Sequence, residues 1–292
     1  MVVSPFIALD WGTTNRRAYA IEDGRIAAVV RSPKGVSAMT ADDYPQELAA
    51  IRAELGDLPV LMAGMVGSTI GWRVAPYVTV PADIADIAAQ LTWIDDRTAI
   101  VPGLSFTDGS HGDVMRGEEV QLLGAALAGQ VPPDALLCQP GTHCKWVELT
   151  GGKVTAFTTA MTGELFALLK GGGVLAPQLT APVTASDAFR DGVREGAKRD
   201  LAASLFGIRA SHVLGLRDPS HAASYASGVL IGSDVAARIG DGRDVHLVAD
   251  GDLATLYATA IETLGSRAIV SGCEDAFIAG ITHIRKLSAC AT

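Results

Sequence analysis

The chain has 292 residues, of which 49% are hydrophobic and only 5% aromatic. At roughly 100–200 residues per domain, this length predicts two domains with cores of small aliphatic side chains. The 32 acidic residues outnumber the 23 basic ones, and the net charge of −9 argues against nucleic acid or anionic lipid as a partner. Uncharged stretches of about 15 residues are too short for a membrane span, and the N-terminus reads as a strand, not a signal peptide. Four cysteines are too few for a disulfide framework, so we expect a cytoplasmic protein that acts on a small molecule.

The first half of the chain begins with three short strands, predicted over 6–10, 17–21 and 25–31. A helix over about 42–55 follows, with its apolar side chains on one face and a glycine after its end. The rest of this half alternates between strands and helices, at 60–63, 82–91, 98–101 and about 118–129. Its order is therefore βββαβαβα.

The second half repeats this order after Pro132-Pro133. Strands are predicted at 135–139, 144–149 and 153–159, and a mostly helical stretch runs from 162 to 239. Strands and helices then alternate at 245–249, 252–264, 267–270 and 272–285. We predict a duplicated α/β fold with a cleft between two domains, 1–132 and 133–292, and a helical insertion over about 162–240 in the second.

A tight turn between the first two strands has the sequence Asp10-Trp11-Gly12-Thr13-Thr14. A carboxylate at the end of a buried strand suits a Mg²⁺–phosphate partner, and Gly12 lets the main chain approach an anion. The amides and hydroxyls of Thr13 and Thr14 are donors for phosphate oxygens. The turn is a candidate phosphate site, although an ordinary hairpin has the same short pattern.

The segment Pro140-Gly141-Thr142-His143-Cys144-Lys145-Trp146 has the same place in the second copy. Two Gly-Thr turns at equivalent points of a duplicated fold indicate a pair of phosphate-binding turns. A zinc site at Cys138, His143 and Cys144 lacks a fourth ligand at a usable spacing, and we discount it.

The segment from Asp113 to Glu119 leads from a polar loop at 107–112 into a helix. A carboxylate at a helix start can accept a proton from a substrate hydroxyl, and Arg116 can bind a carboxylate or a transferring phosphoryl group. Acidic residues in a first helical turn also complement the helix dipole without any catalytic role. The segment therefore has both a catalytic and a purely structural interpretation.

Two more segments follow strand ends. The glycine-rich stretch 63–73 lies where open α/β folds hold ligand loops, and the amides of the turn Asp250-Gly251 can face an adenosine. The sequence contains neither a Walker A pattern nor G-x-G-x-x-G, which argues against P-loop and dinucleotide-binding Rossmann folds.

The turns at 10–14, 141–142 and 250–251, in this order on a duplicated chain, resemble the phosphate-1, phosphate-2 and adenosine motifs of the actin/hexokinase/Hsp70 ATPase fold. Within that fold the chain resembles the 2-dehydro-3-deoxygalactonokinase family nearly from end to end. The strings MAGMVGS, MRGEE, PGTHCKWV and MTGEL carry this resemblance.

The resemblance implies ATP-dependent phosphorylation of the 6-hydroxyl of 2-dehydro-3-deoxy-D-galactonate, a step of D-galactonate breakdown. It implies Mg²⁺ with ATP on the second domain and the sugar acid on the first, with domain closure excluding water. The implied partners are these small molecules, and a homodimer is compatible with them.

The resemblance also assigns roles to individual residues. Asp10 is expected to orient Mg²⁺ through water, and the nucleotide-binding candidates are Gly12, Thr13, Thr14, Gly141, Thr142, Lys145 and Gly251. The sugar-site candidates are Gly67, Ser68, Trp72 and Arg73.

The same resemblance gives the catalytic candidates. Asp113 has the position of the general base, Glu118 is its rival, and Arg116 binds the substrate carboxylate or the transferring phosphoryl group. Asp250 departs from the small residue expected at the adenosine turn, so the adenine site is not assigned in detail.

Three alternatives remain open. A kinase of a related sugar acid, such as 2-dehydro-3-deoxygluconate, differs by a single stereocentre of its substrate. A metal-dependent hydrolase would use Asp108, His111 and Asp113, whose spacing also arises by chance in polar loops. A non-catalytic sugar sensor would bind a sugar without producing ADP.

Overall fold

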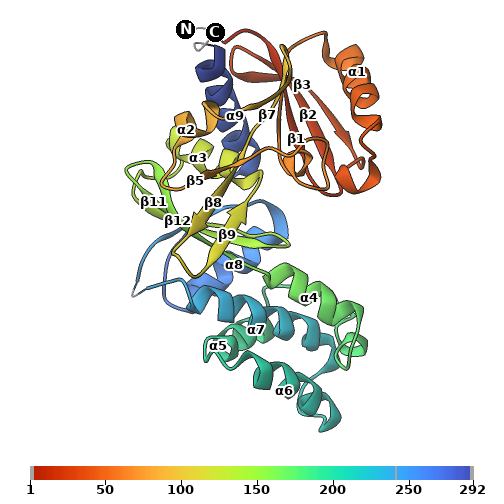
Figure 1. Ribbon diagram of the computed structural model, residues 1–292. Helices are drawn as coiled ribbons and strands as arrows, with labels where there is room; N and C mark the ends of the chain where they lie inside the picture. Colours follow the sequence, from red (N-terminus) through yellow and green to blue (C-terminus); the bar gives the residue numbers. More distant parts are fainter. Residues whose placement is uncertain (1–2, 241, 290–292) are drawn as a thin grey trace. The chain divides into compact units, whose positions relative to one another are not determined.

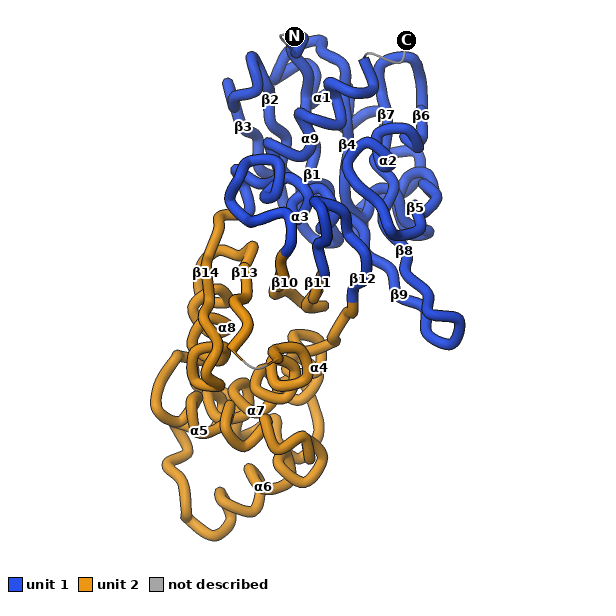
Figure 2. Tube along the Cα trace, turned by 90° about the vertical axis from the view of Figure 1, so that its left-hand side faces the viewer, with its two compact units in different colours: residues 1–134, 148–157, 273–292 blue, residues 135–147, 158–272 orange. Residues whose placement is uncertain are grey.

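The computed structural model describes residues 3–240 and 242–289 (Figure 1). The chain forms two compact units, coloured separately in Figure 2. Unit 1 comprises Met1–Asp134, Glu148–Phe157 and Cys273–Thr292, and unit 2 comprises Ala135–Val147 and Thr158–Gly272. The domain division at residue 132 stays a prediction. In the described residues, no helix has the length and apolar character to cross a membrane.

Unit 1 is built around a six-stranded sheet with the order β3-β2-β1-β4-β7-β6. Its strands are β1 (Phe6–Trp11), β2 (Arg16–Glu22), β3 (Arg25–Ser32), β4 (Val60–Ala63), β6 (Thr92–Asp95) and β7 (Thr98–Ile100). Strand β1 pairs antiparallel with β2 and parallel with β4, so the turn after β1 and the loop after β4 start from the same edge of the sheet. A smaller sheet has the order β5-β8-β9, formed by β5 (Tyr77–Thr79), β8 (Gly103–Thr107) and β9 (Gly112–Met115).

Helices cover both faces of the six-stranded sheet. Helix α1 (Asp43–Leu55) packs on the face with Leu9 and Trp11, and Figure 1 shows this helix along one side of the sheet. On the other face, Phe277 of α9 (Cys273–Ala289) contacts Tyr19, which pairs with Ala8 of β1. Two further helices of unit 1 are α2 (Ile84–Ala88) and α3 (Glu118–Leu127).

Helices α3 and α9 lie against each other at two glycines. A Cβ atom on Gly124 would lie 1.9 Å from the Ala276 carbonyl oxygen, and one on Gly280 would lie 2.1 Å from the Val120 carbonyl oxygen. Only glycine permits such backbone proximity. This contact holds helix α3 in place on unit 1, and with it the glutamates Glu118 and Glu119 of its first turn.

Unit 2 is built around a five-stranded sheet with the order β12-β11-β10-β13-β14. Its strands are β10 (Ala135–Gln139), β11 (Cys144–Thr150), β12 (Lys153–Ala160), β13 (Val245–Val248) and β14 (Ala268–Ser271). Its helices are α4 (Thr162–Gly171), α5 (Asp187–Gly196), α6 (Leu201–Val213), α7 (Ala222–Ala236) and α8 (Gly251–Thr263). The tip of the β11–β12 hairpin belongs to unit 1.

The strand orders confirm the predicted duplication. In each sheet the third, second and first strands are followed by two parallel strands, β4 and β7 in one sheet and β13 and β14 in the other. Short strands outside this scheme, β5, β6, β8 and β9, were not predicted. They are only three to five residues long, which is too short for an alternating pattern to identify a strand in the sequence.

Candidate active site

The turn after β1 is held by its carbonyl groups. The carbonyl oxygens of Gly12, Thr13 and Thr14 accept hydrogen bonds from amides of residues 35–37 at 3.0 to 3.1 Å. A Cβ atom on Gly35 would lie 2.3 Å from the Thr13 carbonyl oxygen, so glycine is required there. Because the carbonyl dipoles point into the protein and the threonine side chains are exposed, the outer side of this turn suits an anion.

Asp10 lies immediately before this turn and is only partly exposed. Burial raises the pKa of Asp10, the Arg17 guanidinium 3.8 Å away lowers it, and the charge of Glu118 raises it again. Two carboxylates, on β1 and at the start of α3, therefore influence each other within unit 1. In the described ranges, no group of three or more His, Cys, Asp or Glu side chains could hold a metal ion on its own. The carboxylate of Asp10, with Glu118 nearby, fits Mg²⁺, which takes one or two carboxylates and completes its shell with water and phosphate oxygens.

Arg116 lies between β9 and α3 and is 9% exposed. Its Nη2 donates to the Ala75 carbonyl oxygen at 2.7 Å, and its guanidinium lies over the Tyr77 ring at 4.3 Å. Its Nε and Nη1 atoms are buried without a hydrogen-bond partner. A Cβ atom on Gly67 would lie 2.8 Å from Nη1, so the guanidinium is next to the glycine-rich loop. Burying unpaired donors of a cation is costly. Nε–H and Nη1 point to different sides of the guanidinium, and Nη1, the donor beside Gly67, is the one that an anionic ligand in this loop would satisfy.

The two glutamates that follow Arg116 have different surroundings. Glu118 is partly exposed, and its Oε2 accepts from the Arg116 amide at 3.1 Å. Glu119 is fully buried, and its Oε2 accepts from the Gly117 amide at 2.6 Å while Oε1 has no partner. Burial and the neighbouring charge of Glu118 raise the pKa of Glu119 to about 8. Sequence reasoning did not single out Glu119, because an acidic residue in a first helical turn is ordinary.

Asp113 lies on strand β9 and not in a loop at the helix start, which corrects the sequence prediction. Strand β9 pairs antiparallel with β8, and Asp113 lies opposite Phe106. Its Oδ1 accepts from the amide of the next residue, Val114, at 2.7 Å. Asp108 accepts from the amides of Ser110 and His111, which is the arrangement of an ordinary turn. The turn thus accounts for Asp108 and His111 of the hydrolase alternative, whereas Asp113 lies outside it on β9.

The glycine-rich loop after β4 contains the sugar-site candidates. Gly67 is buried, whereas Ser68 donates from Oγ to the Met65 carbonyl oxygen at 2.7 Å. The Trp72 ring stacks on the Tyr44 ring with centroids 5.5 Å apart and planes 8° apart. Trp72 is therefore partly buried and packs against the hydrophobic core of unit 1, whereas Arg73 is exposed.

The turn of the second copy rests on the first turn of α4. The Glu164 amide donates to the Thr142 carbonyl oxygen at 2.9 Å, and Glu164 Oε2 lies 2.6 Å from His143 Nε2. A Cβ atom on Gly163 would lie 2.5 Å from the Gly141 carbonyl oxygen, so glycine is required at this contact. Gly141 is half-buried and Thr142 is exposed, as a phosphate-binding turn needs.

Lys145 and the adenosine turn lie in the same unit. Lys145 is buried on β11, and its Nζ donates to Thr159 Oγ1 at 2.8 Å. Asp250 precedes α8 in an extended conformation, and Gly251 has a φ of +65°. The predicted strand-to-helix turn is thus present at these two residues.

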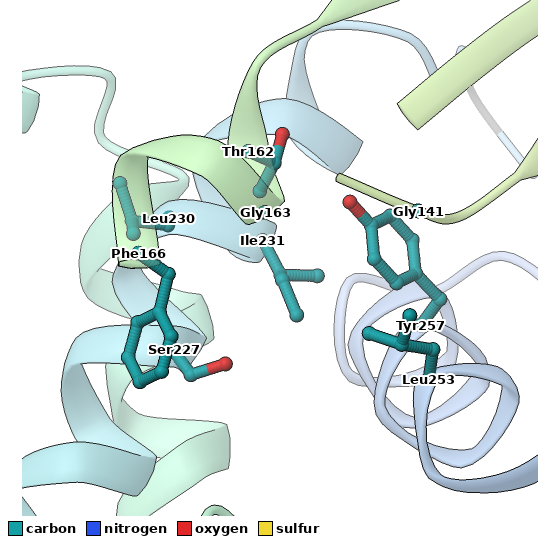
Figure 3. Close-up of a pocket in the computed structure, with 9 residues that line it drawn as sticks. All are labelled: Gly141, Thr162, Gly163, Phe166, Ser227, Leu230, Ile231, Leu253 and Tyr257. Atoms are coloured by element: carbon teal, nitrogen blue, oxygen red, sulfur yellow. The ribbon is translucent and has the colours of Figure 1, made fainter. Parts of the chain in front are cut away.

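A pocket lies next to Gly141 within unit 2 (Figure 3). Its lining comes from α4, α7 and α8 and is mainly apolar, formed by Gly141, Thr162, Gly163, Phe166, Ser227, Leu230, Ile231, Leu253 and Tyr257. Leu253 and Tyr257 of α8 face the residues of α4 and α7 across this space. An apolar pocket with a few polar groups beside a phosphate-type turn suits a nucleoside.

A family profile for 2-keto-3-deoxy-galactonokinase matches residues 10–284. The chain belongs to the 2-keto-3-deoxy-galactonokinase family. The 2-dehydro-3-deoxygalactonokinase of Escherichia coli (strain K12) is 38% identical over 286 residues, which cover 96% of this chain and 97% of that protein. A crystal structure from Sinorhizobium meliloti, provisionally assigned the same activity, is 36% identical with a TM-score of 0.90 and covers 96% of this chain and 98% of that chain.

More distant structures share only the fold with this member of the 2-keto-3-deoxy-galactonokinase family. The activator of 2-hydroxyisocaproyl-CoA dehydratase from Clostridium difficile, with bound ADPNP, is 12% identical with a TM-score of 0.52 and covers 99% of this chain and 97% of that chain. The actin-like ATPase fold and the family expected from the sequence are both confirmed.

Proposed function

We propose that the chain catalyses ATP-dependent phosphorylation of the 6-hydroxyl of 2-keto-3-deoxygalactonate. The observation that carries the proposal is the buried guanidinium of Arg116, whose Nε and Nη1 have no partner and which lies beside Gly67. A charge-assisted hydrogen bond from Nη1 matches a carboxylate oxygen, and a sugar acid has that group. Family membership supplies the reaction class, and this site accounts for an acid as the acceptor.

Within unit 1, we assign the general base to Glu118 and keep Asp113 as the alternative. Glu118 interacts electrostatically with Asp10, whereas Asp113 lies on strand β9. The base would accept the hydroxyl proton as the oxygen attacks the γ-phosphorus. Asp10 would hold Mg²⁺ through water, and the ion when bound neutralises phosphate charge. Thr13 and Thr14 would donate to phosphate oxygens.

Within unit 2, we assign the nucleotide to the turn at Gly141 and Thr142 and to the pocket beside it. The aromatic and aliphatic lining suits a nucleobase, and Gly251 at the start of α8 leaves the main chain accessible. Phosphoryl transfer relies mainly on positioning and charge neutralisation, so donors, one cation and one base are sufficient.

The test is ADP release with Mg-ATP, measured in parallel with 2-keto-3-deoxygalactonate, its gluconate epimer and galactose. We expect a clear preference for the first compound and no rate with galactose, which lacks the carboxylate. A preference for the epimer would keep the mechanism and change the substrate. A folded protein that is silent with all three compounds would contradict the proposal.

A further inference from the structure

A buried carboxylate joins three elements of unit 2. Asp234 of α7 is 9% exposed, and its Oδ1 accepts from Trp146 Nε1 at 3.0 Å. Its Oδ2 accepts from the Thr162 hydroxyl at 2.9 Å and from the Tyr257 hydroxyl at 3.1 Å. The three donors belong to β11, α4 and α8, so a single side chain connects four elements.

Each of these donors is close to a part of the proposed nucleotide site. Thr162 immediately precedes Gly163 and Glu164, on which the turn at Gly141–His143 rests. Tyr257 belongs to the helix that begins at Gly251, and both Thr162 and Tyr257 line the pocket of Figure 3. Strand β11, which contains Trp146, begins at the residue directly after the turn.

The carboxylate is costly for stability alone. Burial raises the pKa of Asp234, and the hydrogen bonds from Thr162, Tyr257 and Trp146 lower it. Apolar side chains of similar volume would often hold four elements together at least as well. Directional hydrogen bonds instead fix the relative placement of the elements, which close packing alone specifies less sharply.

We propose that Asp234 is a positioning residue of the nucleotide site, which fixes the Gly141–His143 turn and helix α8 at the spacing that ATP requires. The inference rests on the proposed function, because it takes the nucleotide to bind unit 2. Asp234 acts through Thr162 and Tyr257 and has no catalytic step of its own.

The first test compares Asp234→Ala with Asp234→Asn. Asparagine keeps the size of the side chain and the oxygen that accepts from Trp146, but its amide nitrogen can only donate, so the hydroxyl hydrogens of Thr162 and Tyr257 lose their acceptor. Alanine leaves three buried donors unpaired. We expect Asp234→Ala to raise the KM for ATP and the Kd for ADP by about tenfold or more, and Asp234→Asn to fall between Asp234→Ala and the wild type. The KM for the sugar acid should change little in both.

A second pair of variants serves if Asp234→Ala does not fold. Thr162→Val removes the hydroxyl and keeps the shape, whereas Thr162→Ser keeps the hydroxyl. We expect the valine variant to raise the KM for ATP and the serine variant to restore it. Glu195→Ala is the matched control, because Glu195 is a partly buried carboxylate of unit 2 that accepts from Ser204 at 3.1 Å and lies outside the nucleotide site. It should leave both KM values unchanged.

The outcomes separate this inference from the proposed function. Unchanged nucleotide affinity in folded Asp234→Ala or Thr162→Val would overturn it, as would a loss of activity that only follows the loss of folded protein. If the wild type binds ADP but phosphorylates none of the sugar acids, the proposed function fails, and calorimetric ADP binding by the same variants still decides the role of Asp234. A wild type that binds no ADP overturns both.

Discussion

The two Gly-Thr turns have equivalent places in the duplicated fold but different supports. The turn at 12–14 is held through its own carbonyl groups by amides of residues 35–37. The turn at 141–143 rests on helix α4, which a buried carboxylate connects to α8. The charges near the turns also differ. Before the first turn, the charge of Glu118 raises the pKa of Asp10. Near the second turn, the buried carboxylate of Asp234 accepts a hydrogen bond from Thr162, the residue before Gly163. The two halves thus share their strand order but differ in how the turn is supported, and the proposed function assigns acid–base chemistry to unit 1 and nucleotide positioning to unit 2.

The largest expected effect tests the chemistry of unit 1. Replacement of Glu118 by Gln should lower kcat at least ~10²-fold with little change in the KM for ATP, because a base that cannot take the proton affects the chemical step. Asp113→Asn serves as the comparison and should stay near the wild type in steady-state assays. The reverse pattern would assign the base to Asp113.

A change in the acid-binding group comes next. Arg116→Lys keeps a positive charge but removes the planar guanidinium and with it the Nη1 donor beside Gly67, so the KM for the sugar acid should rise about 10- to 100-fold while the KM for ATP is retained. Arg97→Lys is the control, since Arg97 is a partly exposed arginine of unit 1 paired with Asp57. Equal effects on both KM values would show that Arg116 holds the fold and not the substrate.

A single methyl group tests the support of the second turn. Gly163→Ala would place a Cβ atom 2.5 Å from the Gly141 carbonyl oxygen, so the turn must shift. We expect the KM for ATP to rise by about tenfold, which corresponds to ~1.4 kcal/mol. Gly207→Ala is the matched helical control, because a Cβ atom there meets nothing within 4 Å. If both variants behave alike, the turn does not depend on this contact.

The last expected effect is on the stability of unit 1 as the pH changes, and not on activity. The pKa of Glu119 is raised from 4.5 to about 8, so between these values the folded protein keeps a proton that the unfolded chain releases. Stability is therefore lost as the pH rises through this window, by at most about 1.4 kcal/mol per pH unit. Glu119→Gln should remove this slope in urea unfolding measured from pH 5 to 8. Parallel profiles for the two proteins would mean that Glu119 ionises normally.

The two turns could be predicted from local sequence patterns, whereas contacts between residues far apart in the chain could not. Asp10–Thr14 and Gly141–Thr142 follow strands and contain glycine, so their places could be predicted from neighbouring residues. Asp234 lies in a helix, and its partners are 23 to 88 residues away in the chain. No spacing rule connects such residues in a single sequence. Asp113 was misplaced because strands β8 and β9 have only five and four residues, too few for a periodic pattern to identify a hairpin in the sequence.

The packing of α9 on α3 has a consequence for synthesis. Unit 2 draws only on residues 135–147 and 158–272, whereas unit 1 also needs residues from 273 onward. A ribosome therefore releases all of unit 2 before unit 1 can close, although unit 1 contains the earlier part of the chain. Until α9 arrives, the surface around Gly124 that receives it remains uncovered. The half of the chain that is synthesised first therefore completes its fold only after the last helix has left the ribosome.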